Sequence, residues 1–298
     1  MIEYLNAKQL DKSSVIKIVR NYANNNMFFE AFSYLKHALY FHNIIDVYYE
    51  VLELYLKSPN SSKKFDCPLV IVWTISPKDV PFVFMADPEE RLRQHMLGLS
   101  GWILDKSFYN IVIVENSNFK LNLDRLKQIG KEYNKNIEYY SFDHSLKAKE
   151  YGKGYGEGEL VQKAFESSGI LRSSSRFTKI NGKLYLPFYE FCYTFNKLPF
   201  EFFNMHRMGD KIVFDTRFYC VNTDFYRHHL YNAHEEVNDH LTNYLEHVFY
   251  EKVKDKLNYW TPIEPVVFGK SGSFDGSYGE YPNVIKEFSS FLIKEIVG

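Results

Sequence analysis

The chain has 298 residues, of which 45% are hydrophobic and 24% charged, as is typical of globular proteins. Its 36 Lys and Arg against 37 Asp and Glu leave a formal net charge of −1, which argues against a nucleic-acid-binding protein. The three cysteines are widely spaced and form no CxxC pair, which argues against a zinc site or a disulfide framework.

The N-terminus and the apolar runs predict where the protein works. The opening residues, MIEYLNAKQLDKSS, lack the apolar core of a secretory signal, and the longest apolar runs, such as 69–75, are too short to span a bilayer. We therefore expect a cytoplasmic protein, peripheral to the inner membrane if it contacts that membrane at all. The high aromatic share of 18% suits either sugar- or base-stacking surfaces or a core rich in Tyr and Phe.

Residues 1–58 are predicted to form a small helical bundle. From about residue 8, apolar residues recur at helical spacing in three segments separated near residues 24–26 and 42–43. Such a bundle buries its apolar faces poorly on its own, so we expect it to dock on the main domain, on a second copy of the chain or on a partner protein. Residues 59–66 are polar and turn-rich, as in a linker.

Residues 67–298 are predicted to form one α/β domain. Short apolar or alternating runs predict strands at 68–75, 109–114, 137–142, 176–180 and 183–186. Helices are predicted between them, beginning at Asp87, near Leu123 and near Glu157. This alternation predicts a mainly parallel sheet flanked by helices, in which ligands bind outside the carboxyl ends of the strands.

Polar residues directly follow the second predicted strand. Glu115, Asn116 and Ser117 would stand at its carboxyl end, where they could contact a ribose or a base edge. The same residues also suit a turn that caps the next helix, and spacing alone does not separate these interpretations.

A glycine-rich segment, Gly152-Lys153-Gly154-Tyr155-Gly156-Glu157, opens the third predicted helix of the domain. Glycines permit close backbone approach, and N–H groups at a helix start favour a diphosphate, as does the charge of Lys153. A flexible surface loop is the alternative, because the segment matches neither the Walker pattern nor the dinucleotide fingerprint.

Two further segments carry charges beside predicted strands. Lys179 and Lys183 flank the dipeptide Asn181-Gly182, which suits a hairpin turn or a phosphate-facing site. Asp215 and Arg217 follow a strand predicted at 212–214, where they would hold a sugar hydroxyl and a phosphate or form a surface ion pair.

A later helix is predicted to carry both Asp239 and Glu246, with Leu241 and Leu245 pointing inward. The alternative to a functional role for these acids is a solvated helix face. Five histidines between residues 228 and 247 match no zinc-binding spacing, so we do not expect them to hold a metal.

In this order, the segments resemble bacterial capsule and lipopolysaccharide glycosyltransferases over residues 68–280, with the N-terminal helices left uncovered. The elements that carry the resemblance are Arg91 to Trp102, Val114-Glu115-Asn116-Ser117, Gly152 to Glu157, Lys179-Ile180-Asn181-Gly182-Lys183, Asp215-Thr216-Arg217-Phe218, Asp239 with Glu246, and Gly269-Lys270-Ser271-Gly272-Ser273.

The resemblance implies a GT-A-like fold and the transfer of a sugar from a nucleotide-sugar donor to a saccharide or lipid-linked saccharide acceptor. It implies nucleoside contacts by Glu115 and Asn116. Further contacts to the donor are implied for Gly152, Lys153, Gly154, Tyr155, Gly156, Glu157, Lys179, Asn181, Lys183 and Arg217. Asp239 is the first candidate for the catalytic base and Asp215 the second, with Glu246 supporting the acceptor.

Most enzymes of that class hold Mg or Mn with an Asp-x-Asp motif, but Asn181-Gly182-Lys183 stands about where this motif is expected. Metal dependence is therefore open, and the counter-charges for the diphosphate would instead come from Lys153, Lys179, Lys183 or Arg217. Two other functions remain: a nucleotidyltransferase, and a non-catalytic nucleotide-sugar-binding or interaction subunit that uses the N-terminal helices.

Overall fold

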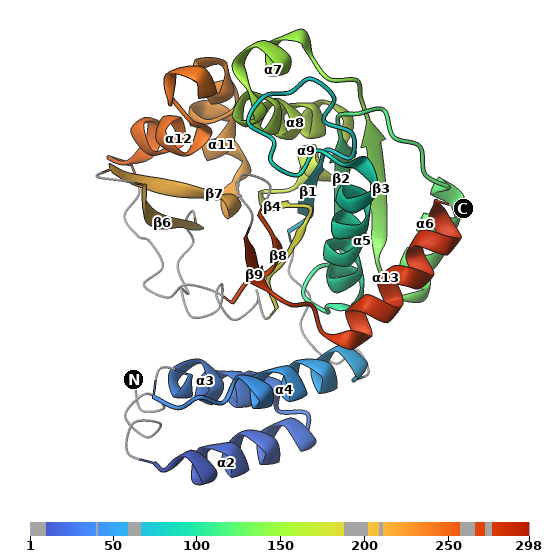
Figure 1. Ribbon diagram of the computed structural model, residues 1–298, viewed down its shortest axis with the longest axis vertical. Coiled ribbons are helices and arrows are strands. Elements are labelled where there is room, and N and C mark those ends of the chain that lie inside the picture. Colours follow the sequence, from blue (N-terminus) through green and yellow to red (C-terminus); the bar gives the residue numbers. More distant parts are fainter. Residues whose placement is uncertain are drawn as a thin grey trace. The chain divides into compact units, whose positions relative to one another are not determined.

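The computed structural model describes residues 10–39, 41–58, 67–187, 202–208, 211–256, 266–271 and 276–297 (Figure 1). The chain divides into two compact units. One comprises Met1–Ser62 with Pro282–Val284, and the other comprises Lys63–Tyr281 with Ile285–Gly298. Over the described ranges, every helix is too short or too polar to cross a bilayer. The predicted linker at 59–66 lies outside the described residues.

The first unit consists of three helices, α2 (Lys12–Asn24), α3 (Phe28–Ala38) and α4 (Ile45–Lys57). Asp11 is the N-cap of α2: its carboxylate accepts hydrogen bonds from two N–H groups of the first turn. Apolar side chains of all three helices form the core of this unit, and the ring of Phe28 meets that of Tyr55 edge-on at 5.5 Å.

The second unit is built on a six-stranded sheet in the order β3-β2-β1-β4-β7-β6. Its strands are β1 (Leu69–Trp73), β2 (Asn110–Glu115), β3 (Asn136–Ser141), β4 (Arg176–Asn181), β6 (Phe202–Met208) and β7 (Lys211–Asn222). The first four are parallel, whereas β7 runs antiparallel to both β4 and β6. The predicted mainly parallel α/β sheet is confirmed. A small antiparallel sheet contains β5 (Leu184–Tyr185), β8 (Phe268–Lys270) and β9 (Ser277–Gly279).

Helices cover both faces of the main sheet. On one face, Val70, Val72 and residues of β2 pack on α8 (Lys153–Ser167). On the other, Trp73 meets His95 of α5 (Pro88–Leu104), with ring centroids 5.3 Å apart. Every residue of β1 is buried, as expected for a strand covered on both faces.

The remaining helices complete these layers. They are α6 (Leu123–Glu132), α7 (Leu146–Tyr151), α9 (Gly169–Ser173), α11 (Thr223–His229), α12 (Leu245–Val253) and α13 (Asn283–Ile296), with 3-10 turns η1 (Ala233–Glu236) and η2 (Asp239–Leu241). The helix predicted at Asp87 is confirmed, since the Asp87 carboxylate accepts from two N–H groups at the start of α5.

The single helix predicted through Asp239 and Glu246 is wrong. Asn238 caps the short turn η2, and Thr242 takes a left-handed φ of 57°, so the chain enters α12 only afterwards. Leu241, which was expected to point inward, is 74% exposed. The break arises because the Asn238 side chain offers the backbone a local alternative to a continuous helix.

The strand predicted at 212–214 is only the start of β7, which spans twelve residues. Asp215, Thr216 and Arg217 therefore lie inside a strand rather than after one. Residues 218–222 extend it by pairing with β4, and their β-branched and aromatic side chains favour that conformation. Because successive side chains of a strand point to opposite faces of the sheet, the side chain of Thr216 lies on the other face from those of Asp215 and Arg217.

Gly98 provides a test of how α5 packs on the sheet. A Cβ at Gly98 would collide with the carbonyl oxygen of Gly182, which follows β4. We expect Gly98→Ala to lower the free energy of unfolding by about 1–3 kcal/mol in urea denaturation, because backbone cannot yield as a flexible side chain can. Gly169→Ala is the control, since nothing lies within 4 Å of its added Cβ. Equal stabilities for the two variants would contradict this close approach.

Candidate functional site

Charged side chains gather at the carboxyl ends of the parallel strands, around the start of α8. This group, called the charged cluster below, consists of Arg91, Lys153, Glu157, Lys179, Lys183, Asp239 and Glu246. These residues come from four separate segments of the sequence, and the fold places them close together. The edge of the sheet where they meet is the one at which α/β proteins bind ligands.

Lys179 is a fully buried member of the charged cluster. Its ammonium donates to Asn181 Oδ1 at 2.7 Å and to the carbonyl oxygen of Thr216 at 2.6 Å. It also donates to Glu157 of α8, which completes its three hydrogen bonds. Lys179 thus joins β4, β7 and α8 and retains no donor for the phosphate that the sequence assigned to it.

Thr216 connects β7 to α12. Its hydroxyl donates to Glu246 Oε1 at 2.9 Å. Burial raises the pKa of Glu246, and the nearby charge of Glu157 raises it further. From the sequence, roles were assigned to Asp215 and Arg217 but none to Thr216 between them. In a longer strand, Thr216 would point to the opposite face from these two residues, and this alternation is the signal that could have identified it.

Asp239 lies under the start of α8. Its Oδ2 accepts the N–H of Gly154 at 3.0 Å, while its Oδ1 is buried without a hydrogen-bond partner. Gly152 precedes the helix with a φ of 110°, and a Cβ there would collide with the Asp239 carboxylate. Burial raises the pKa of Asp239, although Gly154 and Lys153 act in the opposite direction. A carboxylate in this place stabilises the positive end of the helix dipole.

The glycine-rich segment is part of α8 and not a loop. The helix begins at Lys153, about four residues before the predicted start, and glycines 154, 156 and 158 lie in its first two turns. A Cβ at Gly158 would collide with His234, and the ring of Tyr155 packs on that histidine at 5.0 Å. The glycines therefore let α8 approach its neighbours, a use that the sequence does not distinguish from a phosphate-binding loop.

Lys183 follows the dipeptide Asn181-Gly182, which does not form a hairpin because β4 pairs with β1 and β7 whereas β5 pairs with β8. The Lys183 side chain is only 8% exposed, and within the described ranges its ammonium makes no hydrogen bond or ion pair. Burial lowers its pKa to about 7, and the charges of Arg91 and Lys153 contribute. A buried, unpaired ammonium beside two other cations is suited to an anionic ligand.

Arg91 is the second buried cation of the cluster. From α5 it donates to the carbonyl oxygens of Thr74 and Met85, the latter at 2.9 Å. Burial lowers its pKa to about 10, and the charge of Glu115 opposes this effect. These bonds hold the guanidinium at the carboxyl end of β1.

Glu115 is occupied by the protein's own donors. Its Oε1 accepts the N–H groups of Ser117 at 2.8 Å and Ile75 at 3.3 Å, as well as the Ser117 hydroxyl. Its Oε2 accepts the Phe119 N–H at 3.0 Å and the Ser141 hydroxyl at 2.9 Å. Five donors fill the lone pairs of one carboxylate, so Glu115 shapes the ends of three strands instead of offering an acceptor to a nucleoside.

Asn116 and Ser117 belong to the same network. Asn116 Oδ1 accepts the hydroxyl of Thr74 at 2.7 Å, and Ser117 Oγ accepts the N–H of Ser76 at 3.0 Å. The next helix is capped by Asn122 and not by these residues. The turn interpretation therefore accounts for the bonds of the segment, and Asn116 remains 3.5 Å from the place where a Cβ of Gly156 would stand in α8.

Asp215 and Arg217 form a buried ion pair away from Thr216. Arg217 donates to Oδ1 and Oδ2 of Asp215 at 2.7 and 2.5 Å, and its guanidinium lies 4.6 Å from the ring centroid of Tyr278. Burial acts to lower the pKa of Arg217, but the hydrogen bonds that it donates to Asp215, together with the charge of that carboxylate, raise it overall. Both oxygens of the second candidate base are thus held by arginine.

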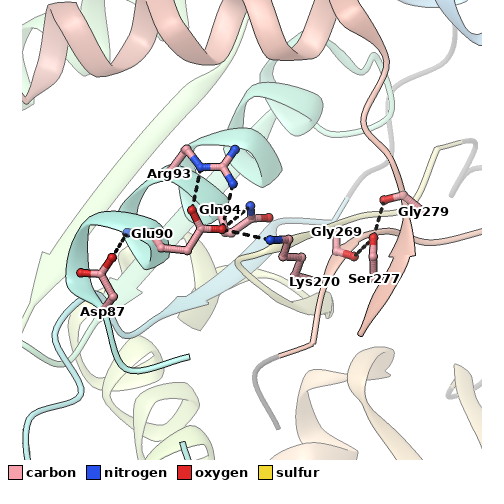
Figure 2. A network of polar contacts seen from close by, with 8 residues as sticks. All are labelled: Asp87, Glu90, Arg93, Gln94, Gly269, Lys270, Ser277 and Gly279. Atoms are coloured by element: carbon pink, nitrogen blue, oxygen red, sulfur yellow. Dashed lines mark hydrogen bonds and ion pairs between the residues drawn. The ribbon is translucent and has the colours of Figure 1, made fainter. Parts of the chain in front are cut away.

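The C-terminal Gly/Ser-rich segment is described only as far as residue 271. Figure 2 shows Lys270 reaching Glu90 at the start of α5, at 3.2 Å, beside Arg93. The hydrogen bonds of Arg93 lower the pKa of Glu90 to about 2, although burial opposes them. The Tyr281 hydroxyl donates to the carbonyl oxygen of Lys183 at 2.7 Å, so Tyr281 supports the turn that carries this lysine.

The residues at the expected Asp-x-Asp position do not fit a divalent metal. Asn181 Oδ1 is bonded to Lys179, and Lys183 places a cation where the motif would place a carboxylate. Within the part of the chain that the structure describes, no group of three or more His, Cys, Asp or Glu side chains is arranged to hold a metal ion.

No protein-family model and no curated protein matches the sequence. Among solved structures, the fold is similar to the glycosyltransferase GlyE of Streptococcus pneumoniae TIGR4, with 9% identity, a TM-score of 0.46 and coverage of 76% of this chain and 65% of GlyE. It is also similar to 4-diphosphocytidyl-2C-methyl-D-erythritol synthase of Anaerococcus prevotii DSM 20548, with 10% identity, a TM-score of 0.38 and coverage of 77% and 97%.

A third similar structure is a glucose-1-phosphate thymidylyltransferase from Bacillus anthracis, with 11% identity, a TM-score of 0.39 and coverage of 68% of this chain and 89% of the other. These neighbours are thus glycosyltransferases and nucleotidyltransferases. Identities and TM-scores this low assign no activity to the present chain.

Lys179→Met tests the buried ammonium. The change leaves the Glu157 carboxylate without its partner, so we expect the free energy of unfolding to fall by about 1–3 kcal/mol. Adding Glu157→Gln to that variant should recover part of the loss, because no unpaired charge then remains. A double-mutant cycle by urea denaturation measures the coupling, and strictly additive effects would contradict the pair.

The titration of Lys183 makes stability depend on pH. Its pKa is lowered from 10.5 to about 7 in the folded protein. Between these values the unfolded chain binds more protons than the folded one, so the Lys183 contribution to the free energy of unfolding rises with pH. Thermal unfolding of the wild type and Lys183→Met from about pH 6 to 9 should show this rise only in the wild type. If the two proteins change in stability with pH in the same way, the pKa of Lys183 is not lowered by folding.

Proposed function

We propose that the protein is a glycosyltransferase that moves a sugar from a nucleotide-sugar donor to a saccharide or lipid-linked saccharide acceptor, in the synthesis of a surface polysaccharide. One observation carries the proposal: the buried, unpaired ammonium of Lys183 shares a cluster with Arg91 and with the carboxylates of Asp239 and Glu246. Fixed cations suit a leaving diphosphate, and carboxylates with raised pKa suit a base.

The cationic part of the cluster is the proposed site for the diphosphate of the donor. Lys183, Arg91 and Lys153 are close enough for the charges of the other two to lower the pKa of Lys183. Binding of an anion would remove that mutual repulsion. As the bond between sugar and diphosphate breaks, negative charge grows on the leaving oxygen, and cations already held in place stabilise it without rearrangement.

The nucleoside is proposed to bind along the carboxyl ends of β1 and β2, beside Asn116 and Thr74. Their side chains bond each other at the start of α8, next to the cationic part of the cluster. Glu115 fixes the loops of this subsite through its five donors. The order of motifs resembling capsule and lipopolysaccharide glycosyltransferases supports a sugar donor and a surface-polysaccharide acceptor.

The proposal is tested by nucleotide binding and product release. Lys183→Met should weaken binding of UDP or GDP by about 10- to 100-fold, since a charge-assisted hydrogen bond contributes about 1.5–3 kcal/mol. Thermal stabilisation of the protein by UDP, GDP and CMP measures this binding. Lys127→Met is the control, because it removes the same charge from an exposed position on α6.

The product separates this function from nucleotidyl transfer. A panel of nucleotide-sugars incubated with a saccharide acceptor should release nucleoside diphosphate and no pyrophosphate. Release of pyrophosphate from a nucleoside triphosphate and a sugar phosphate would instead identify a nucleotidyltransferase. Absence of any stabilisation by the nucleotides would contradict both enzymes and leave an interaction subunit.

A further inference from the structure

We propose that Glu246, and not Asp239, is the catalytic base, that Thr216 positions it, and that Asp239 fixes the start of α8. This inference rests on the proposed function, since it assigns the residue that accepts the proton of the acceptor hydroxyl. It changes the role that the sequence gave to each of the two acids.

Accessibility distinguishes the two carboxylates. Asp239 is only 2% exposed; one oxygen accepts the Gly154 N–H, and the other is sealed from solvent. A substrate hydroxyl could reach it only if α8 moved. Glu246 is half-buried, and its single hydrogen bond to another side chain uses Oε1. Among the described residues, Oε2 of Glu246 has no hydrogen bond to another side chain. Glu157 is half-buried too, but its carboxylate is held by the ammonium of Lys179, so we assign Oε2 of Glu246 to the acceptor hydroxyl.

Glu246 is also held on rigid elements. It lies in the first turn of α12, and the Thr216 hydroxyl of β7 fixes its Oε1. The carbonyl oxygen of the same threonine accepts from Lys179, whose ammonium also binds Glu157 of α8. One chain of bonds thus connects the base to α8 and to the middle of the sheet, which gives the positional precision that catalysis requires.

The groups around Glu246 raise its affinity for a proton above that of an exposed carboxylate. Burial and the charge of Glu157 raise its pKa, whereas the Thr216 hydroxyl and the charge of Lys153 lower it. A carboxylate whose pKa is raised toward the working pH accepts a proton more readily in the transition state than an ordinary surface carboxylate does.

The proposed sugar transfer is a single displacement at the anomeric carbon. The acceptor oxygen forms a bond to the anomeric carbon while the bond from that carbon to the diphosphate oxygen breaks. The proton of the acceptor hydroxyl moves to Glu246, and the electron pair of the broken bond leaves with the nucleoside diphosphate. Attack from the side opposite the leaving group inverts the anomeric configuration.

Glu246→Gln tests the base directly. We expect kcat to fall by about 100-fold or more, while nucleotide-sugar binding changes little, because the amide keeps the shape but cannot accept the proton. Glu251→Gln is the matched control: Glu251 lies on the same helix, is largely exposed and pairs with Lys254 at 2.7 Å. An active wild type in which both variants turn over equally would overturn the inference.

Thr216 is tested as a positioning residue through the pH profile. Removing its hydroxyl in Thr216→Val should raise the pKa of Glu246, so the acid limb of kcat/KM should move to higher pH. Thr216→Ser retains the donor and should restore the limb. A Thr216→Val profile with an unmoved limb and lower stability alone would show a merely structural role.

Asp239→Asn separates a helix cap from a base. The Asn amide oxygen can still accept the Gly154 N–H, so this variant should lose far less kcat than Glu246→Gln, whereas Asp239→Ala should also lose stability. Loss of turnover in a folded Asp239→Asn, with Glu246→Gln active, would assign the base to Asp239. If the wild type neither binds nucleotides nor releases nucleoside diphosphate, the proposed function fails and the inference falls with it.

Discussion

The ammonium of Lys179 is the interaction on which the site depends. A fully buried charge is stable only when acceptors surround it, and here they come from α8, β4 and β7. The ring of Tyr219, whose centroid lies 5.8 Å from the ammonium, adds a cation–π contact. Three elements from distant parts of the chain are therefore fixed to one another at the carboxyl edge of the sheet.

This arrangement separates the charges of the cluster. Glu157 is committed to Lys179, and within the ranges that the structure describes no carboxylate is bonded to Lys183 or Arg91, so the end of β4 is left cationic. Asp239 is buried and Glu246 is half-buried, and desolvation raises the pKa of both, which disfavours their charged forms. In the proposed transfer reaction, the cations would stabilise the leaving anion, and an acid with a raised pKa would accept the proton.

The sequence predicts elements whose signal is local and misses contacts that depend on distant partners. Buried strands such as β1 and the Asp87 cap follow from short runs of residues. The burial of Lys179 does not, since two of its three partners lie 22 and 37 residues away in the chain. The role of Asp215 was mispredicted for the same reason. Pairing of β7 with the distant strands β4 and β6 places Asp215 inside a long strand, where it bonds Arg217.

Under the proposed function, a diphosphate site that uses Lys183 in place of a divalent metal would respond differently to pH. A divalent metal keeps its charge across the physiological range, whereas an ammonium with a pKa of about 7 loses much of its charge near neutrality. In the proposed reaction a bound diphosphate would favour the charged form, so the lysine would take up a proton when the donor binds and release it once the product leaves. The affinity for product would then fall as pH rises above 7, because the uncharged lysine no longer attracts the diphosphate.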